Sequence, residues 1–454
     1  MAEPTVVVVG GGLAGIAAAL RAADRGCAVT LLESRPRLGG AAFSFRRGEL
    51  TVDNGQHVFL RCCAAYRWFL DRVGGTELTT LQDRLDIPVL APGGRSGRLR
   101  RTSGVPAPAH LTAALAGYRL LSVADRARAV RGAVALRLLN PADPSLDRRT
   151  LGEYLRRHGQ NDATIAALWG IVATATLNLG PDDASLALAA KVFRTGLLDS
   201  AAAADIGHAT APLGELHSVA AGAALAGAGV AVTLGARVET VGGGPVVRFR
   251  ADGSVREVRP DAVVLAVPPR ELFALAPALS GTAAAPARQL QTAPIVNVHV
   301  VYDRPVTDLP FAAGVGTPVQ WVFDRTESSG LRRSRPGGQY LAVTVSAADD
   351  LIDVPARAIV DRFVAALAEL FPRARRAEVL DAFVTRERHA TFRQAAGTAP
   401  LRPGPDSGLP GVALAGAWTA TGWPDTMESA VRSGVAAAQH ILGVASSDLV
   451  EFAA

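Results

Sequence analysis

The first 33 positions of the chain contain two apolar runs separated by glycines and a helical stretch. Thr5–Val9 consists of threonine and valine only, which predicts a buried strand. Gly10–Gly15 follows, and Ile16–Arg25 is rich in alanine, as in a helix. Ala28–Glu33 is a second apolar run and ends in an acid. This order predicts a strand–helix–strand (βαβ) unit at the N-terminus.

The middle of the chain differs from the N-terminus in its pattern of residues, with arginine-rich and helix-like segments. We expect Asp53–Leu60 to be a short extended segment and the arginine-rich Gly93–Arg101 to be a loop. From His110 to Leu139, arginines are scattered among leucine, valine and alanine, which predicts mostly helix. Further helices are expected at Leu151–His158, Ala163–Leu177 and Leu186–Leu198. Together these segments predict an inserted helical region.

Strand patterns return in the second half of the chain. Val246–Arg250 and Val255–Val258 flank Asp252-Gly253, a dipeptide typical of a hairpin turn. Strands up to residue 267 are expected to rejoin the N-terminal domain, and the strands after residue 290 to form a second sheet. The other expected strands are Val230–Leu234, Ala236–Val241, Asp261–Val267, Ile295–Val301, Val319–Phe323, Tyr340–Ser346 and Gly411–Ala417. The other expected helices are Leu213–Ala228, Ala356–Leu370 and Thr426–Leu442.

Composition narrows the class of protein. The chain has 454 residues, of which 49% are hydrophobic and 19% charged, so a large core can be buried and disorder is not expected. The net charge is +6, but no basic run is interleaved with aromatic residues, so no nucleic-acid partner is predicted. The basic balance fits attraction to an anionic membrane surface better.

The cysteines and the N-terminus bear on the compartment. Cys27, Cys62 and Cys63 form neither a disulfide framework nor a zinc-binding spacing, and no metal site is predicted. The first residues lack the positive region of a signal peptide, and no apolar run is long enough to span a membrane. We therefore expect a cytoplasmic protein, soluble or peripheral on the inner face of the membrane.

The glycine-rich segment carries the first chemical signal. Gly10, Gly12 and Gly15 match the G-x-G-x-x-G pattern of dinucleotide-binding proteins, and an acid, Glu33, lies 18 residues beyond the last glycine. Gly10 permits a tight turn, Gly12 lets a pyrophosphate approach the backbone, and Gly15 lets helix and strand pack closely. The helix N-terminus offers N–H donors to phosphates, and Glu33 would bind ribose hydroxyls. The pattern alone does not separate NAD from FAD, and a plain glycine-rich turn is the alternative.

Two later segments favour a flavin dinucleotide. Gly39-Gly40 offers a second close approach of backbone to cofactor, although an ordinary turn would have the same sequence. Leu414–Ala430 predicts a strand ending in Gly416, a turn-rich loop and a helix that begins near Thr426. The positive end of that helix can face the flavin and stabilise its anionic reduced form. A simple strand–loop–helix closing the domain is the alternative.

Together these segments resemble the amine oxidase and phytoene desaturase superfamily of FAD proteins. The residues that carry the resemblance are Gly10–Gly15, Glu33, Gly39-Gly40, Ala236–Val241, Val263–Pro268 and Gly416–Ala430. A narrower resemblance is to the squalene-associated branch, whose members are hydroxysqualene dehydroxylases. It rests on Asp53–Phe59, Tyr66–Leu70, Ala175–Asn178 and Ala415–Gly434.

The resemblance implies an α/β fold, in which an FAD-binding Rossmann-like domain of the amine oxidase type carries an inserted α+β substrate domain. The FAD-binding domain would be discontinuous, with residues 1–60, 208–270 and 409–445. Residues 61–207 and 271–408 would form the substrate domain, with a helical part facing the membrane. Residues 446–454 would be a tail.

The resemblance also implies cofactor contacts. Val238 would contact adenine through its backbone, and Arg37 would approach the phosphates. Gln56 and His57 would lie near the isoalloxazine, and the backbone of Met427 near the flavin carbonyl edge. The full expected set is Gly10, Gly12, Leu13, Ala14, Gly15, Glu33, Ser34, Arg35, Arg37, Gly39, Gly40, Ala41, Gln56, His57, Val238, Gly416, Ala417, Thr426 and Met427.

Two positions depart from the superfamily pattern. Many members have an acid after the glycine that corresponds to Gly416, and an arginine after the glycine pair. This chain has Ala417 and Ala41 there. Ala417 removes one cofactor hydrogen bond, worth about 1 kcal/mol. We therefore expect weaker retention of FAD, not loss of binding.

The narrower resemblance implies that hydroxysqualene is reduced to squalene. Hydride from the flavin would reach an allylic carbon while the hydroxyl leaves as water, helped by a general acid. His57 and Asp53 are the candidates, because their segment is expected beside the flavin. Each residue has a purely structural alternative: Asp53 would cap the Asn54-Gly55 turn, and His57 would pack against the flavin. Glu428 is expected to satisfy backbone donors at the start of its own helix.

The substrate class points to the partners. An apolar pocket between the helices of residues 111–139 and 169–198 would hold the triterpene alcohol. The expected partners are an unidentified electron donor, upstream prenyl synthases and a membrane surface, for which His110–Leu139 fits an interfacial helix as well as a solvated face. The alternatives are a carotenoid-type desaturase or amine oxidase, with hydride flowing to the flavin, and a non-catalytic prenyl-lipid binding protein.

Overall fold

The N-terminal βαβ unit forms as predicted. The computed structural model describes residues 3–443 and residue 452, so most of the predicted tail, 446–454, lies outside the described residues. β1 (Thr5–Val9) and β2 (Ala28–Glu33) pair in parallel, and α1 (Leu13–Ala23) connects them. The helix begins directly after Gly12, three residues before the predicted start.

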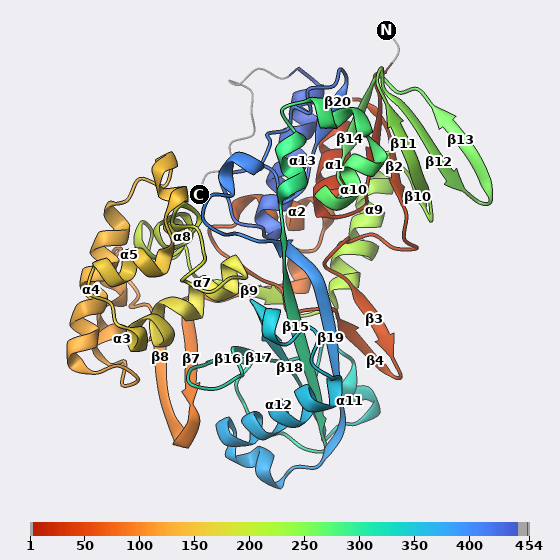
Figure 1. Cartoon of the computed structure of the whole chain (residues 1–454). Helices are drawn as coiled ribbons and strands as arrows, with labels where there is room; N and C mark the ends of the chain where they lie inside the picture. Colours follow the sequence, from red (N-terminus) through yellow and green to blue (C-terminus); the bar gives the residue numbers. More distant parts are fainter. Residues whose placement is uncertain (1–2, 444–451, 453–454) are drawn as a thin grey trace.

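A five-stranded parallel sheet is built around this unit, in the order β10-β2-β1-β14-β20 (Figure 1). α13 (Met427–Ile441) packs on α1 so closely that a Cβ on Gly434 would collide with the carbonyl oxygen of Ala14. The strands of the parallel sheet come from three distant parts of the sequence. The domain boundaries themselves stay a prediction. The three added strands are β10 (Ala231–Leu234), β14 (Ala262–Leu265) and β20 (Val412–Leu414).

Beside the parallel sheet lies a small antiparallel one. It consists of β11 (Arg237–Gly242), β12 (Val246–Ala251) and β13 (Ser254–Val258). The predicted turn between the last two strands is present, with φ of +50° at Asp252 and +75° at Gly253. Positive φ at both central residues is the conformation that Asp-Gly adopts readily in hairpins.

A second, seven-stranded sheet forms the other large body, in the order β19-β15-β18-β17-β16-β7-β8. α12 (Ala356–Leu370) covers one face, where Phe363 packs with Val298 and Val300 in a buried cluster. The long pair β15 and β19 runs up from this sheet towards the parallel sheet (Figure 1). The strands are β7 (Asp86–Ala91), β8 (Arg95–Arg100), β15 (Thr292–Tyr302), β16 (Phe311–Gly314), β17 (Trp321–Asp324), β18 (Gln339–Val345) and β19 (Val379–Phe392).

Some expectations for this sheet are wrong. Most of Gly93–Arg101, expected as a loop, is strand β8, in which Gly97 and Leu99 are half-buried while the alternate arginines are exposed. The many arginines obscured the alternation of half-buried and exposed positions that is typical of a strand. Asp53–Leu60 is not one extended segment, because residues 54–57 form a turn between two strands. Those strands are β4 (Leu50–Asp53) and β5 (Val58–Leu60).

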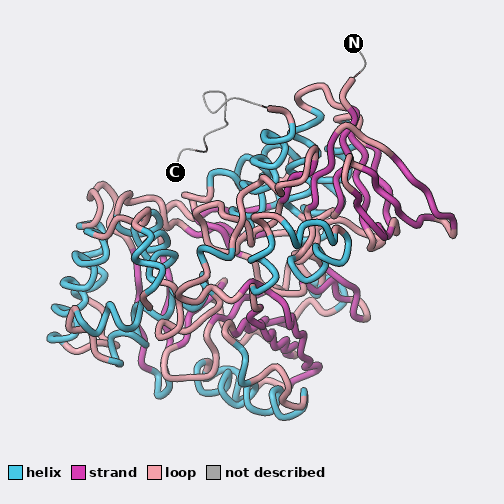
Figure 2. Tube along the Cα trace, turned by 45° about the horizontal axis from the view of Figure 1, so that its top comes forward, coloured by secondary structure: helices cyan, strands magenta, loops and turns pink. Residues whose placement is uncertain are grey.

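The predicted helical region is present and lies on one side of the molecule (Figure 2, cyan, left). The expected helix over 110–139 is broken at residues 117–122. Within the described part of the chain, no helix is both long and apolar enough to cross a membrane. The helices of this region are α3 (Thr112–Ala116), α4 (Val123–Leu138), α5 (Leu151–Arg157), α6 (Asp162–Thr164), α7 (Gly170–Leu177) and α8 (Leu186–Phe193).

The remaining elements are short and lie between the two main sheets or at their edges. β3 pairs with β4, and β9 pairs with both β5 and β6. Their bounds are β3 (Ser44–Arg47), β6 (Thr79–Leu81), β9 (Ile206–Ala209), α2 (Ala64–Val73), α9 (Ala221–Gly227), α10 (Pro269–Leu275) and α11 (Leu331–Ser334).

Candidate active site

Two of the three glycines of the N-terminal motif, Gly10 and Gly15, lie where no larger residue fits. Gly10 has φ +108°, and a Cβ there would collide with the carbonyl oxygen of Ala266 on the neighbouring chain segment. A Cβ on Gly15, inside α1, would collide with the carbonyl oxygen of Gly10. Gly12 is the residue that directly precedes α1, so the free N–H groups of Leu13 and Ala14 start there. The segment therefore has the tight turn and the close helix–strand contact that a dinucleotide loop needs.

Glu33 lies at the end of β2, next to this loop. Its carboxylate is buried and accepts hydrogen bonds from the N–H of Gly11 (2.6 Å) and of Arg35 (2.7 Å), and from the hydroxyl of Ser34 (3.2 Å). A carboxylate has about four acceptor positions, so one is left for a further donor such as a ribose hydroxyl. The N–H of Ala236 donates to the Glu33 carbonyl (2.9 Å), which brings the start of β11 beside the acid.

Val238 follows on β11 and is buried, and the strand's register shifts directly after it. The structure thus places this expected adenine contact two residues beyond a segment that is hydrogen-bonded to Glu33.

The second glycine pair lies against the first loop. The N–H of Gly39 donates to the Gly11 carbonyl (2.9 Å), and a Cβ on Gly40 would lie 2.8 Å from the Cα of Gly12. Both Gly39 and Gly40 have positive φ, +96° and +58°. The two glycine segments therefore form one backbone cradle with no side chain between them, as a pyrophosphate requires.

Arg37 is turned towards its own loop. Its guanidinium lies 3.6 Å from the centre of the Phe43 ring and donates to the Gly40 carbonyl (3.1 Å). Burial, with the charge of Arg35 nearby, lowers the pKa of Arg37. The expected phosphate contact of Arg37 stays a prediction, and the geometry gives this residue a role in holding the Gly39–Gly40 turn.

The turn of residues 54–57 connects this cradle to β19 and β15, the edge strand of the second sheet and its neighbour. The side chain of Asn54 accepts from the Phe43 N–H (3.0 Å) and donates to the Ala41 carbonyl (2.9 Å) and to Glu387 on β19 (3.0 Å). The backbone carbonyl of Asn54 accepts from the side chain of Asn297 on β15 (2.9 Å). The neighbouring Gln56 has a buried amide nitrogen without a partner among the described residues.

His57 has a defined tautomer in this turn. Its Nδ1 lies 3.1 Å from the Gly55 carbonyl, which can only accept, so Nδ1 carries the proton and Nε2 is bare in the neutral ring. Burial lowers the pKa of His57. The neutral ring can therefore accept a proton at Nε2 but has none to give there.

Asp53 has a different environment from the one expected. It does not cap the Asn54-Gly55 turn: its Oδ2 accepts from Arg325 (2.7 Å), and its Oδ1 accepts from the Ser44 hydroxyl (2.6 Å) and the Leu213 N–H (2.9 Å). Both partners of the ion pair are buried. These three contacts fix the position of the carboxylate and give Asp53 a structural role.

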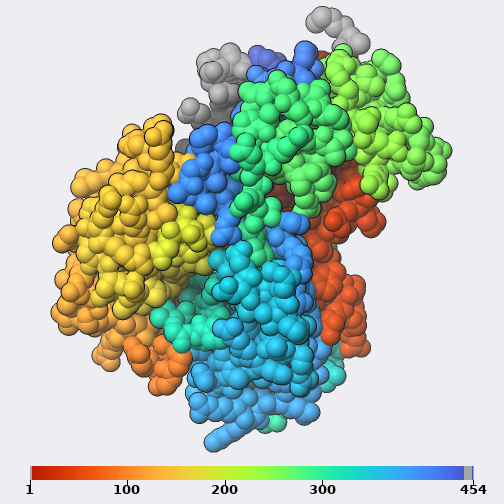
Figure 3. Space-filling view, in the orientation of Figure 1, coloured from red at the N-terminus to blue at the C-terminus, as the bar shows by residue number. Residues whose placement is uncertain are grey.

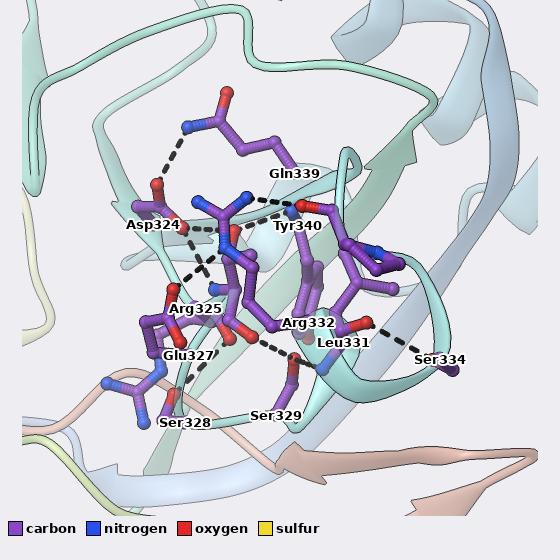
Figure 4. A network of polar contacts seen from close by, with 12 residues as sticks. Asp324, Arg325, Glu327, Ser328, Ser329, Leu331, Arg332, Ser334, Gln339 and Tyr340 are labelled. Carbon is purple, nitrogen blue, oxygen red and sulfur yellow. Dashed lines mark hydrogen bonds and ion pairs between the residues drawn. The ribbon is translucent and has the colours of Figure 1, made fainter.

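The segment that carries Arg325 is itself held by polar contacts (Figure 4). Asp324 accepts from the Gln339 amide (2.7 Å) and the Thr326 N–H (2.9 Å), and the N–H of Arg325 donates to the Tyr340 carbonyl (2.8 Å). Arg325 also donates to the Ala209 carbonyl (2.9 Å). Asp53 therefore ties β4 to the end of β17 through a fixed guanidinium.

A buried arginine shapes the loop after β20. Arg402 is only 8% exposed. Its guanidinium donates to the backbone carbonyls of Trp418 (3.1 Å), Thr419 (2.5 Å), Trp423 (2.9 Å) and Ala417 (3.3 Å). Burial lowers the pKa of Arg402 to about 10. Sequence reasoning missed this residue, because one arginine among the 46 of the chain carries no local signal.

The flavin-side helix begins as predicted. Thr426 is the N-cap of α13, and its hydroxyl accepts from the Ser429 N–H (3.3 Å); Met427 is the first helical residue. Gly416 lies two residues after the end of β20 and has φ +144°, and a Cβ there would collide with the Trp418 ring. The side chain of Ala417 is a methyl group, and the expected loss of one cofactor hydrogen bond there stays a prediction.

Glu428 acts on a different helix from the one expected. Its buried carboxylate accepts from the N–H groups of Ala65 (3.2 Å) and Tyr66 (2.8 Å) and from Arg432 (2.6 Å). The expectation that it serves its own helix is wrong, since it caps α2. This links α13 to a helix more than 360 positions earlier in the chain.

Asp425 is the acid at the site that sequence reasoning missed. Its Oδ2 accepts from the Phe392 N–H on β19 (2.8 Å), and its own N–H donates to the Gln394 side chain (2.9 Å). Burial raises the pKa of Asp425 to about 6. Its place directly before the predicted Thr426–Met427 contacts was the only available signal. β19 connects the two halves of the site, because Glu387 meets Asn54 and Phe392 meets Asp425.

Comparison with known proteins agrees with this geometry. The family model described as "Flavin containing amine oxidoreductase" matches residues 13–442. Hydroxysqualene dehydroxylase of Rhodopseudomonas palustris is 30% identical over 447 residues, covering 96% of this chain and 98% of the relative. Zeta-carotene desaturase of Zea mays is 25% identical over 482 residues, covering 96% and 83%. A solved triple mutant of putrescine oxidase has the same fold, with TM-score 0.72 and 20% identity over 98% of this chain and 99% of that one.

The cofactor that fits these residues is FAD. The glycine cradle leaves room for a pyrophosphate, Glu33 has an acceptor position to spare, and the buried amide of Gln56 has no partner in the described part of the protein. Residues around Gly12, Glu33 and Gly40 would hold the dinucleotide, and the Gln56 and Met427 segments its flavin end.

Proposed function

Because the chain belongs to the family of flavin-containing amine oxidoreductases, and is an FAD-dependent oxidoreductase, we propose that it reduces hydroxysqualene to squalene. The observation that carries this proposal is the end-to-end similarity to a hydroxysqualene dehydroxylase, over 96% of this chain and 98% of the relative. The protein would work in squalene and hopanoid biosynthesis. Upstream prenyl synthases would supply the substrate, and an external electron donor would supply the electrons.

The overall reaction replaces an allylic hydroxyl by hydrogen. Bound FAD, once reduced, supplies hydride for the allylic carbon. The carbon–oxygen bond breaks with its electron pair on oxygen, and the departing hydroxide takes one proton to leave as water. The protein must therefore hold one acidic proton near the cofactor and keep bulk water away from the reacting carbon.

We assign this proton to Asp425 rather than to Asp53. Burial raises the pKa of Asp425 to about 6, so a useful fraction is protonated near neutral pH. Asp53 is bound to Arg325 and two further donors. His57 remains a candidate for a second role: its bare Nε2 can accept a hydrogen bond from the water that forms. Asp53 would then be a positioning residue that holds β4 and the turn after it.

The first experiment is an anaerobic single turnover. The bound flavin is reduced, hydroxysqualene is added, and flavin absorbance is followed while products are extracted. We expect the flavin to reoxidise and squalene to form in matching amount. If the flavin stays reduced while the substrate is bound, the dehydroxylase proposal fails.

The same experiment separates the second candidate, a carotenoid-type desaturase, which the similarity to zeta-carotene desaturase favours. A desaturase would instead reduce oxidised flavin on addition of a polyene. A non-catalytic prenyl-lipid binding protein is not carried further, because the family is one of oxidoreductases.

The Asp425→Asn variant tests the proton donor. The amide can still accept from the Phe392 N–H, so the fold and FAD content are expected to stay as they are, while turnover falls about 100-fold or more. His57→Gln and the isosteric Asp53→Asn are the comparisons. Unchanged turnover in Asp425→Asn with full flavin content would rule out this residue as the acid.

We also propose that the protein works at a membrane surface, because its proposed substrate is a hydrocarbon alcohol that dissolves in lipid and not in water.

A further inference from the structure

Helix α4 presents four of its five large apolar side chains to the outside. Val123, Val130, Val134 and Leu138 are 77%, 51%, 52% and 81% exposed. They are four of the ten large hydrophobic residues that are exposed in the described part of the chain, and they all lie on this one helix of 16 residues. The other six are spread over several elements. Such clustering on one element distinguishes a binding surface from isolated exposed residues.

These four residues form a single stripe. Their spacings of seven, four and four positions match the helical repeat, so that at about 100° per residue they fall within roughly 80° of each other around the helix axis. The helix lies at the outer edge of the helical region (Figure 1), which forms a separate lobe in the space-filling view (Figure 3, gold and orange). The stripe is therefore a continuous apolar ridge along an outer helix.

The inward face of α4 carries mostly small residues, and Leu136 is its one buried large apolar side chain. Ala129, Gly132 and Ala135 are buried, and a Cβ on Gly132 would lie 2.9 Å from atoms of Gln160 and Trp169. A helix at the surface of a protein in water normally has the opposite arrangement, with large apolar residues inside and polar ones outside. This inversion indicates that the outer face of α4 is covered by something apolar when the protein works.

The borders of the stripe are positively charged. Arg131 and Arg137 lie on opposite sides of it, are exposed, and form no ion pair within the described residues. The one acid of the helix, Asp125, is buried and bound to Ser122, Arg128 and Asn161. The outer face of α4 thus combines apolar and cationic groups and has no anionic one.

More positive charge lies near α3, on and around strands β7 and β8. α3, which accepts a hydrogen bond from Arg126 of α4 through the Ala116 carbonyl, borders a hollow of about 400 Å³ that is lined by Arg84, Arg98, Arg100 and Arg101. Arg98 and Arg100 share one carboxylate, Asp86, and Arg84 has no ion pair in the described part of the chain. The region therefore keeps a positive excess, which attracts an anionic surface over about one Debye length.

We propose that α4 docks the protein on an anionic phospholipid bilayer, with the stripe of Val123, Val130, Val134 and Leu138 in the interfacial layer and the flanking arginines at the phosphates. Charge complementarity selects this occupant: apolar residues bordered by arginines, without acids, match an anionic lipid interface. The inference rests on the proposed function in one respect, that the substrate resides in lipid. It adds the face of the molecule that meets the membrane and the class of lipid.

The test uses the full-length holoenzyme and two double variants with the same change in charge. Val134→Glu/Leu138→Glu places acids on the stripe, and Val255→Glu/Leu380→Glu places them at exposed apolar positions of β13 and β19. Sedimentation with vesicles of phosphatidylcholine containing 30% phosphatidylglycerol, and with vesicles of phosphatidylcholine alone, gives the partition coefficients. We expect the α4 variant to bind the anionic vesicles at least about tenfold more weakly than the parent protein does. The β13/β19 variant is expected to bind like the parent. The parent itself is expected to bind anionic vesicles more tightly than neutral ones.

Three results overturn the proposal: a parent that binds no vesicles, an α4 variant that binds as tightly as the parent, or a parent that binds neutral vesicles equally well. Self-association of the parent that the α4 variant abolishes, without vesicle binding, would make the stripe a contact between copies of this chain instead. Activity separates this question from the proposed function. The α4 variant is expected to keep turnover with detergent-dispersed hydroxysqualene and to lose it with substrate in vesicles, whereas a wrong function leaves both variants and parent inactive in detergent.

Discussion

Removing the charge of Asp53 is expected to weaken folding before it affects chemistry. The ion pair with Arg325 has an N–O distance of 2.7 Å, and its side chains are only 5% and 9% exposed. Breaking such a pair from one side leaves a buried charge without a partner, at about 3–5 kcal/mol. Asp53→Asn keeps an oxygen for the Ser44 hydroxyl and the Leu213 N–H, so its loss should lie near 3 kcal/mol. Asp53→Ala loses those two hydrogen bonds as well, which adds about 1 kcal/mol each.

The free energy of unfolding by denaturant, measured for each variant as the holoenzyme, checks this order. Asp381→Asn is the matched control, because its pair with Arg47 is more than 40% exposed on both sides and should change stability by less than about 1 kcal/mol. Arg325→Met in the Asp53→Asn background should recover part of the loss, since the unpaired buried charge is then gone. An Asp53→Asn protein as stable as the parent, with turnover lost, would refute the scaffold argument and return Asp53 to the chemistry.

Four further outcomes follow from the site. Asp425→Asn should remove a pH dependence of stability. The pKa of Asp425 is raised from 3.8 to about 6 in the fold, so its stabilising contribution is present below pH 4 and is lost as pH rises through 6, by up to about 3 kcal/mol relative to the variant in chemical denaturation. Gly40→Ala should weaken FAD at least about tenfold in a fluorescence titration, because φ is +58° and the new Cβ would press on Gly12. Glu428→Gln should lower the unfolding free energy by about 2 kcal/mol through the first turn of α2. Ala417→Glu should tighten FAD by about fivefold if it restores a hydrogen bond, and an unchanged affinity would contradict that reading.

The sequence was sufficient wherever local pattern and chemistry coincide. The βαβ unit, the Asp252-Gly253 hairpin and the cap at Thr426 depend on neighbouring residues, and their predicted positions agree with the structure to within a few residues. Strands β8 and β19 were missed for different reasons. Exposed arginines mask the alternation in β8, and most of β19 is half-buried, so no apolar period is visible.

The long-range contacts could not be read from the sequence. Asp53 and Arg325 are 272 positions apart, and Glu428 meets Tyr66 across 362 positions. Nothing near either residue indicates its partner, so Asp53 looked like a candidate acid and Glu428 like a cap for its own helix. Asp425 lies within the predicted strand–loop–helix segment Leu414–Ala430. Its pKa is raised by burial against β19, and the local sequence does not indicate that burial.

The hydrogen bonds of Arg402 bear on how this protein can change over evolutionary time. All four of its contacts in the loop after β20 are to backbone carbonyls and none is to a side chain. These four points of the loop are therefore held through backbone groups, which every residue has, while Trp418 anchors the loop through its side chain as well. An exposed residue of this loop such as Ala420 can therefore be exchanged while the path of the chain stays the same. A clamp of this kind lets a scaffold change exposed side chains in the loop without first losing its fold.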